Sequence, residues 1–176
     1  MPRTALERRL IRRLQATGPI SVASYMAEVL TSPDGGYYSG GEGGDRDPFG
    51  AAGDFVTAPE ISQMFGELLG LWCAEGWQRL GAPDPVTLAE LGPGRGTLMS
   101  DALRAAKMLP GFDRALQVHL VEVSRALRHT QAEALGARIA GFHDQVGDLP
   151  EGPALTIANE FFDALPVRQF ERTERG

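Results

Sequence analysis

The chain has 176 residues, 43% of them apolar and 23% charged, which is ordinary for a globular protein that buries one core. Its net charge of −6 gives no support for a nucleic-acid partner or an anionic membrane surface. Its single cysteine, Cys73, excludes an intrachain disulfide, and no apolar run approaches the length of a membrane span.

The N-terminal stretch predicts two short helices. Residues 4–16 carry leucines on one helical face and arginines elsewhere, and the pair Gly18-Pro19 ends that pattern. Ser21 stands where it can cap a second helix that runs to about Leu30. We assign both helices to an N-terminal helical region that covers residues 1–85.

A glycine-rich loop, residues 32–54, interrupts this region. It is rich in glycine and aspartate and has no periodicity, and loops of this length are usually functional or mobile. Asp45 and Asp47 resemble calcium ligands, but Phe49 and Val56 stand where an EF-hand loop needs a ligand and a bidentate glutamate. We expect a mobile lid or a disordered segment here.

The segment after the loop predicts one long helix. Thr57 and Glu60 have the spacing of a capping box, in which they occupy the N-cap and the third helical position. Apolar residues then recur every three or four positions, which predicts that they face the core: Ile61, Met64, Phe65, Leu68, Leu69 and Trp72. Cys73 is expected in the same core, and Gly81 with the prolines that follow ends the helix.

Strands and helices alternate over residues 86–176. Apolar runs predict strands at 86–91, 116–121, 138–142 and 154–158, with helices at 97–108 and 124–136 and the start of another strand at 167–170. This alternation predicts an α/β fold with a parallel, doubly wound, Rossmann-like sheet. Open nucleotide-binding sheets usually have about five strands or more. We therefore expect an incomplete sheet, in which residues 86–176 are the N-terminal half of a cofactor-binding domain.

The stretch ELGPGRGT joins the first predicted strand to the next helix. Glycines let the backbone turn sharply and approach a ligand closely, and a helix N-terminus favours an anionic group. A dinucleotide fingerprint needs a small residue where this chain has Thr97, and a Walker A loop needs a Gly-Lys pair that is absent. Glu90 followed by Gly92, Gly94 and Gly96 instead resembles the first motif of class I S-adenosylmethionine methyltransferases.

Carboxylates also follow the second and third predicted strands. Ligands of open α/β sheets bind at the carboxyl ends of the strands. Glu122 ends the second strand, where an acid accepts hydrogen bonds from ribose hydroxyls. Asp144 or Asp148, after the third strand, is placed to accept the adenine amino group, and a polar turn is the alternative for either one. We take Asp148 as the cofactor-binding candidate.

The fourth predicted strand ends in the stretch ANEFFDALP. Asn159, Glu160 and Asp163 stand beside two phenylalanines, a mixture of polar and aromatic groups that suits the place where a substrate meets a cofactor. The alternative is that Phe161 and Phe162 belong to the core and Asp163 caps a turn. We expect Asn159 to contact the cofactor and the two carboxylates to contact the substrate.

Four blocks of sequence, in this order, resemble one family: GDFVTAPEISQMFGELLGLW, ELGPGRGTLMSDALR, HLVEVSRALRHTQ and IANEFFDALPVRQF. It is the MidA-type class I methyltransferase family, whose mitochondrial members are complex I assembly factors. The resemblance runs from about Ser21 to Phe170 and implies a Rossmann-like fold with S-adenosylmethionine as cofactor. Family members are roughly double this length, which agrees with an incomplete sheet, and the glycine-rich expansion near residues 39–47 departs from the family's pattern.

The resemblance also implies roles and partners. It places Glu90 and the three glycines at the methionine end of the cofactor and Glu122 at its ribose. In the mitochondrial members it implies symmetric dimethylation of an arginine on a respiratory complex I subunit, hence a protein substrate. It implies the mitochondrial matrix for a eukaryotic source and the cytoplasm for a bacterial one. From the net charge and the lack of a long apolar run, we expect no nucleic acid or membrane as partner.

An arginine substrate raises a chemical problem, because its guanidinium stays protonated in proteins. Two carboxylates that grip it bidentately would turn one nitrogen toward the methyl group. Glu160 and Asp163 are our candidates for this catalytic pair. Residues 53–60 are a candidate gate over the cofactor.

Two other functions remain open from the sequence. The first is an NAD(P)-dependent oxidoreductase. Thr97 argues against it, because a dinucleotide fingerprint has a small residue at that position. The second is a non-catalytic assembly factor that has kept the methyltransferase fold. A zinc site is not expected, because the three histidines are scattered and the chain has no H-E-x-x-H or C-x-x-C motif.

Overall fold

The computed structural model describes residues 3–32, 35–39 and 56–173. They belong to two compact units, one with the residues up to 39 and from 162 onward, the other with residues 56–161. The predicted lid, including Asp45 and Asp47, lies almost wholly outside the described residues. The helices at 58–79, which the sequence grouped with the N-terminal region, belong to the unit that holds the sheet.

The N-terminal unit contains α1 (Ala5–Thr17), α2 (Val22–Thr31) and the short 3-10 helices η1 (Tyr37–Ser39) and η4 (Phe162–Ala164). The predicted cap of α2 is confirmed, because the Ser21 hydroxyl accepts a hydrogen bond from the Ser24 N–H at 3.1 Å. Thr4 caps α1 in the same way by accepting from the Glu7 N–H at 3.1 Å. Of the α1 leucines, Leu14 is exposed.

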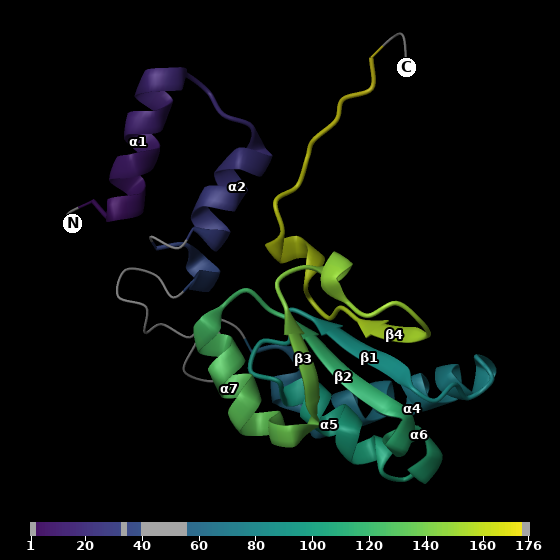
Figure 1. Ribbon diagram of the computed structural model, residues 1–176. Coiled ribbons are helices and arrows are strands. Elements are labelled where there is room, and N and C mark those ends of the chain that lie inside the picture. Colours follow the sequence, from purple (N-terminus) through teal and green to yellow (C-terminus); the bar gives the residue numbers. More distant parts are fainter. Residues whose placement is uncertain (1–2, 33–34, 40–55, 174–176) are drawn as a thin grey trace. The chain divides into compact units, whose positions relative to one another are not determined.

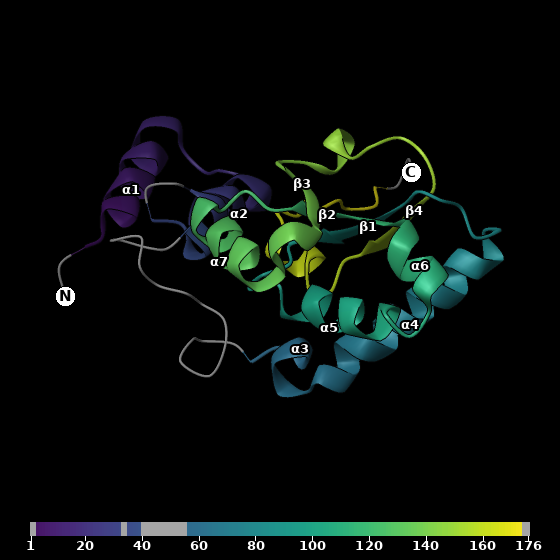
Figure 2. The same cartoon turned by 60° about the horizontal axis from the view of Figure 1, so that its bottom comes forward.

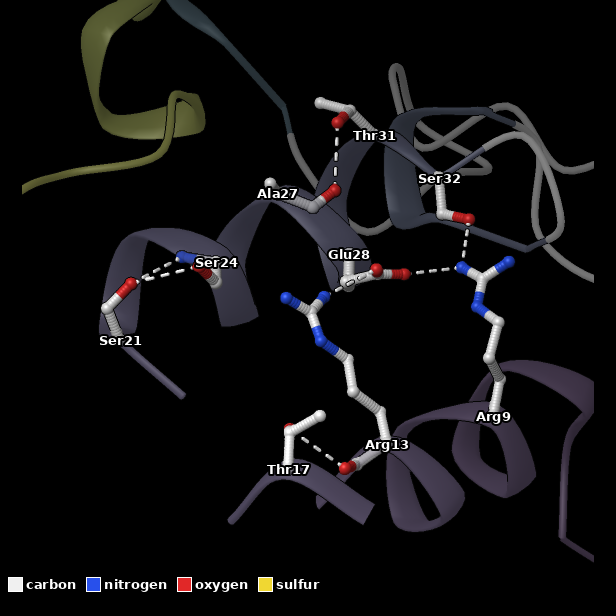
Figure 3. A network of polar contacts seen from close by, with 9 residues as sticks. All are labelled: Arg9, Arg13, Thr17, Ser21, Ser24, Ala27, Glu28, Thr31 and Ser32. Carbon is white, nitrogen blue, oxygen red and sulfur yellow. Dashed lines mark hydrogen bonds and ion pairs between the residues drawn. The ribbon is translucent and has the colours of Figure 1, made fainter. Parts of the chain in front are cut away.

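An ion-pair network joins α1 to α2 (Figure 3). Arg9 and Arg13 on α1 both contact the Glu28 carboxylate on α2, at 2.5 Å and 2.9 Å, and Arg9 also donates to the Ser32 hydroxyl. The three charged side chains are partly exposed, so each pair contributes no more than about 1 kcal/mol. The network therefore sets the relative orientation of two short helices that have no buried residues of their own.

The second unit is built on a parallel sheet of four strands (Figure 1). They are β1 (Val86–Leu91), β2 (Leu116–Val121), β3 (Ile139–His143) and β4 (Ala154–Ile157), in the order β3-β2-β1-β4. Leu88 lies opposite Val118 on one side and Leu155 on the other. The chain order reverses beside β1, so the switch point lies between β1 and β4, where open α/β sheets bind their ligands. The predicted parallel α/β architecture is confirmed.

Helices cover one face of this sheet (Figures 1 and 2). They are α4 (Gln63–Arg79), α5 (Thr97–Ala106), α6 (Pro110–Ala115) and α7 (Arg125–Leu135), preceded by the single turn α3 (Ala58–Ile61). Short 3-10 turns, η2 (Gly136–Arg138) and η3 (Val146–Asp148), flank β3. The core lies between sheet and helices and joins strand residues such as Leu88, Val118 and Leu120 to Met99 and Phe112.

The buried face of α4 differs from the prediction. Four members of the predicted core stripe are 61–72% exposed: Ile61, Met64, Leu68 and Trp72. The buried face is instead made of small residues, Gly66, Gly70, Cys73 and Ala74. A Cβ atom on Gly70 would lie 2.5 Å from the Ala102 carbonyl oxygen of α5, so the two helices approach too closely for a side chain. The close approach of α4 and α5 therefore determines which face of α4 is buried. Phe65 and Leu69 pack at the border of that face.

Two smaller predictions were also wrong, and one helix was missed. The predicted helix after Thr57 is broken, because α3 ends at Ile61 and Ser62 caps a separate α4. Residues 167–170 form no strand, and α6 was not predicted. Cys73 is buried as expected, and among the described residues no helix is both long and apolar enough to cross a membrane.

Candidate functional site

The carboxyl ends of the strands bring most of the predicted site residues to one edge of the sheet. Because all four strands are parallel, the segments that follow β1, β2, β3 and β4 emerge at the same edge. Backbone hydrogen bonds continue the pairing into these segments, from Gly92 N–H to Val121 O and from Glu122 N–H to His143 O, both at 3.0 Å. The candidate site is therefore fixed by the register of the sheet.

The glycine loop after β1 uses left-handed backbone at all three glycines. Gly92, Gly94 and Gly96 have φ of 62°, 53° and 83°. A Cβ atom at Gly92 would meet the Phe161 ring at 2.6 Å, and one at Gly96 would touch Gln131 at 3.6 Å. At Gly94 no atom of the described residues lies within 4 Å of that position. The loop is thus packed at both ends and open at its middle, as a cradle for a ligand requires.

Glu90 lies buried behind this loop. Its side chain is 3% exposed and accepts one hydrogen bond from the Met99 N–H in the first turn of α5. Burial raises the pKa of its carboxyl from 4.5 to about 8, and the bond from Met99 opposes that rise only in part. Its Oε2 atom has no hydrogen-bond partner among the described residues. A buried carboxylate oxygen without a donor is a position that a cationic ligand group would satisfy.

Glu122 follows β2, and both of its carboxylate oxygens accept hydrogen bonds. Its Oε1 accepts from the Ser124 N–H at 2.8 Å, and its Oε2 accepts from the Gln131 amide at 3.3 Å. The residue is 8% exposed. Burial raises the pKa of its carboxyl, and these hydrogen bonds act in the opposite direction. The predicted helix cap by Ser124 is present, with its hydroxyl accepting from the Leu127 N–H.

Glu60 has a role that the capping box did not predict. Thr57 makes no side-chain cap, and the Glu60 carboxylate instead accepts a hydrogen bond from the Thr97 hydroxyl at 2.6 Å. It also lies 3.9 Å from the Arg95 guanidinium. Glu60 therefore ties α3 to the far end of the glycine loop, where α5 begins.

The segment after β3 places its two aspartates in different contacts. Asp144 forms an ion pair with Arg128 at 2.8 Å, and Arg128 also donates to the Glu122 carbonyl oxygen at 2.7 Å. The guanidinium of Arg128 lies over the Phe142 ring, 5.5 Å from its centroid. Asp148 accepts from the Gln145 amide at 3.0 Å. Arg128 thus connects the segments after β2 and β3. The contact of Asp148 with the adenine amino group stays a prediction.

The segment after β4 reaches the glycine loop through Phe161, whose ring lies against Gly92. Glu160 has φ of 47°, a left-handed conformation that costs a non-glycine residue energy and is common at functional sites. Asn159 precedes it and is half-buried. Asp163 belongs to the N-terminal unit. There the pKa of Tyr38 is raised mainly by burial of its hydroxyl and, to a smaller extent, by the negative charge of Asp163. The predicted pair of Glu160 and Asp163 is therefore divided between the two units.

The structure brings two of the three histidines together. His119 Nδ1 and His143 Nε2 are 2.8 Å apart on neighbouring strands, so one ring donates and the other accepts. Burial, followed by the charge of His143, lowers the pKa of His119. His129 is exposed on α7. The described ranges hold no group of three or more side chains that could bind a metal ion.

A sheet of this order, with a left-handed glycine loop after β1 and a carboxylate after β2, has the architecture of class I methyltransferases. A family model described as "Putative S-adenosyl-L-methionine-dependent methyltransferase" matches residues 68–176, and the chain belongs to this family. The fold and the cofactor predicted from the sequence, a Rossmann-like sheet and S-adenosylmethionine, are thereby confirmed.

Named relatives are similar over nearly the whole chain. A mitochondrial protein arginine methyltransferase NDUFAF7 of Danio rerio is 44% identical over 95% of this chain. The human protein of that name is 42% identical over 99%. A COG1565 superfamily protein from Burkholderia thailandensis, solved with bound S-adenosyl-homocysteine, superposes with a TM-score of 0.75 over 92% of the chain at 32% identity. The chain spans 44% of the length of the first two relatives and 42% of the third.

These findings favour a methyltransferase over the oxidoreductase that the sequence left open. Three polar residues with defined contacts at the site were not predicted: Gln131, Arg128 and the Glu60 carboxylate as a partner of Thr97. For Gln131 the sequence does contain a signal. It lies four residues from both Leu127 and Leu135, so it is a polar residue on the apolar stripe of α7.

Proposed function

We propose that this chain forms the cofactor-binding part of an S-adenosylmethionine-dependent protein arginine methyltransferase. The observation that carries the proposal is the glycine loop, which is open at Gly94 and lies between the buried carboxylates Glu90 and Glu122. An arginine substrate is supported by the mitochondrial relatives, which are named protein arginine methyltransferases, and the ligand class by the Burkholderia structure with S-adenosyl-homocysteine.

In this proposal, different residues of the chain contact different parts of the cofactor. Glu90, with its unpartnered Oε2, receives the ammonium group of the methionine part, and the loop through Gly92, Gly94 and Gly96 lets the backbone approach that part closely. Glu122 accepts from the ribose hydroxyls. Asp148 binds the adenine amino group, and Asn159 contacts the cofactor from the segment after β4. The bound cofactor supplies an electrophilic methyl group.

Methyl transfer needs positioning more than acid–base chemistry, because charge disperses along the line of displacement. An arginine substrate must present one nitrogen to the methyl group while its guanidinium remains protonated in the ground state. Glu160 and Asp163 grip the guanidinium in this proposal. The left-handed backbone of Glu160 supports it, since such strain is kept where a side chain must be aimed.

The carboxylate pair can be tested in the intact protein. Glu160→Gln and Asp163→Asn each keep side-chain size but remove the charge, and we expect each to lower kcat by about 100-fold or more. The dissociation constant of S-adenosyl-homocysteine should stay near that of the wild type. Glu151→Gln, an exposed glutamate before β4, is the matched control. Unchanged turnover in both variants would remove the pair from the mechanism.

The partner is a protein that carries the target arginine, and we propose a subunit of respiratory complex I. The support is the family resemblance together with the mitochondrial names of the relatives. We propose the mitochondrial matrix as the location of the methyltransferase for a eukaryotic source, and the cytoplasm for a bacterial source. Mass spectrometry of complex I from cells with and without the protein should show loss of arginine dimethylation.

Calorimetric titration with S-adenosylmethionine and with NADH tests the function as a whole. We expect saturable binding of S-adenosylmethionine and none of NADH. The reverse result would establish the oxidoreductase. Binding of S-adenosylmethionine without any methylated product in cell extracts would instead establish the non-catalytic assembly factor.

A further inference from the structure

Gln131 on α7 is fully buried and contacts two parts of the proposed cofactor site. Its Nε2 lies 2.7 Å from the Gly94 carbonyl oxygen and 3.3 Å from Glu122 Oε2. Neither the carbonyl nor an ionised carboxylate has a proton to donate, so the amide nitrogen must face both. Both protons of Nε2 are thereby used, and the orientation of the amide is determined.

These two contacts join the ends of different strands. Gly94 is the middle glycine of the loop after β1, and Glu122 follows β2. The second oxygen of Glu122 is already held by the Ser124 N–H. Both oxygens of the carboxylate therefore accept hydrogen bonds, and one of the donors, Gln131, also holds the glycine loop.

A glutamine at position 131 costs free energy that an apolar residue at the same position would not. Gln131 Oε1 is buried and has no hydrogen-bond partner among the described residues. A methionine would fill similar volume with no unsatisfied polar atom, and it would suit the apolar stripe that Leu127 and Leu135 form. The polar side chain is better explained by what its Nε2 holds.

We propose that Gln131 is a positioning residue that locks Glu122 to the glycine loop, so that the ribose contact and the methionine cradle form as one unit. This inference rests on the proposed function, because it presupposes that Glu122 and the loop hold the cofactor. It adds the residue that makes their geometries depend on each other.

Binding of S-adenosyl-homocysteine to the intact protein tests the lock through a double-mutant cycle. Gln131→Met and Glu122→Gln should each weaken binding by about tenfold, the loss expected for one hydrogen bond to a charged group. The double variant should bind about as well as the weaker single variant, because the lock is already lost. Gln78→Met, an exposed glutamine on α4, is the matched control and should bind like the wild type.

Two further readouts separate positioning from a structural role. The midpoint of thermal unfolding without ligand should change little in Gln131→Met. The hydrogen bonds that Gly94 and Glu122 lose are offset by removal of the unsatisfied Oε1. Relative to the wild type at the same pH, Gln131→Glu should bind poorly at pH 8 and recover toward pH 5.5, where its protonated carboxyl again donates one hydrogen bond. Gln131→Met should show no such recovery.

The outcomes distinguish this inference from the proposed function. If the wild type does not bind S-adenosyl-homocysteine, the proposed function fails. If the wild type binds and Gln131→Met binds equally well, the lock alone is refuted. Fully additive losses in the double variant, or a fall in unfolding midpoint that accounts for the weaker binding, also refute it.

Discussion

Gly94→Val is expected to abolish binding of S-adenosylmethionine while the protein remains folded. Gly94 has φ of 53°, and within the part of the chain that the structure describes no atom lies within 4 Å of the position that a Cβ atom would take. A valine side chain would project into the open middle of the loop, which is where we place the cofactor. We expect the dissociation constant for S-adenosyl-homocysteine, measured by calorimetry, to rise by at least about 100-fold.

Gly136→Val is the matched control for this change. Gly136 follows α7, has φ of 52°, and likewise has no atom within 4 Å of its Cβ position. Both variants force a β-branched residue to a positive φ and should each lose about 1–3 kcal/mol of stability. Only Gly94→Val should lose the ligand. Equal loss of binding in both variants would mean that strain is responsible, and wild-type affinity in Gly94→Val would show that the cofactor does not lie over the loop.

The strands and helix caps could be predicted from the sequence because their signals are local. β1 and β2 begin and end at the predicted residues, and the caps by Ser21 and Ser124 are present. A buried parallel strand needs only a continuous apolar run, and a cap needs one hydroxyl at the right position. The parallel direction of the strands then follows from the alternation of elements, so most candidate site residues could be placed at one edge.

The face that α4 buries could not be predicted in this way. Hydrophobicity favours Ile61, Met64 and Trp72, but the neighbouring helix α5 requires a face without side chains. Gly66 and Gly70 supply that face, and their value depends on a partner that is distant in the sequence. Apolar periodicity therefore identified the helix correctly and its buried side wrongly.

Polar residues that act within the site were missed for a related reason. Glu60 has the spacing of a capping residue, yet its partner is the Thr97 hydroxyl on another helix. Arg128 has the sequence context of a solvated helix face, yet it contacts the segments after both β2 and β3. A local pattern reports what a side chain can do with its neighbours along the chain, and the fold decides which distant group it meets.

Glu90→Gln is expected to remove a large pH dependence of stability. In the folded protein without cofactor the pKa of Glu90 is about 8, against 4.5 for an exposed glutamate. Between these two values the folded state binds the proton and the unfolded state does not. The free energy of unfolding of the wild type should therefore be highest near pH 4.5, fall by about 1.4 kcal/mol per pH unit as the pH rises toward 8, and then level off.

Glutamine keeps the shape of the buried side chain and cannot ionise. The variant should lack this fall, so it should be more stable than the wild type at pH 8.5 by a few kcal/mol and similar to it near pH 5. Denaturant unfolding at pH 5, 7 and 8.5 measures the difference. Glu151→Gln, at an exposed position, should follow the wild type at every pH. A wild type whose stability does not fall over this range would show that Glu90 ionises freely.

Ligand binding gives the same substitution a second, opposite effect. An ammonium group beside Glu90 Oε2 favours the ionised carboxylate, so binding near pH 7 should release a proton from the wild type. Calorimetry in two buffers with different ionisation enthalpies counts that proton. Glu90→Gln should release none and bind more weakly, although it is the more stable protein at that pH. If Glu90→Gln released as many protons as the wild type, Glu90 would only support the first turn of α5. The expected result instead identifies Glu90 as a group whose burial destabilises the free protein and which binds a cation.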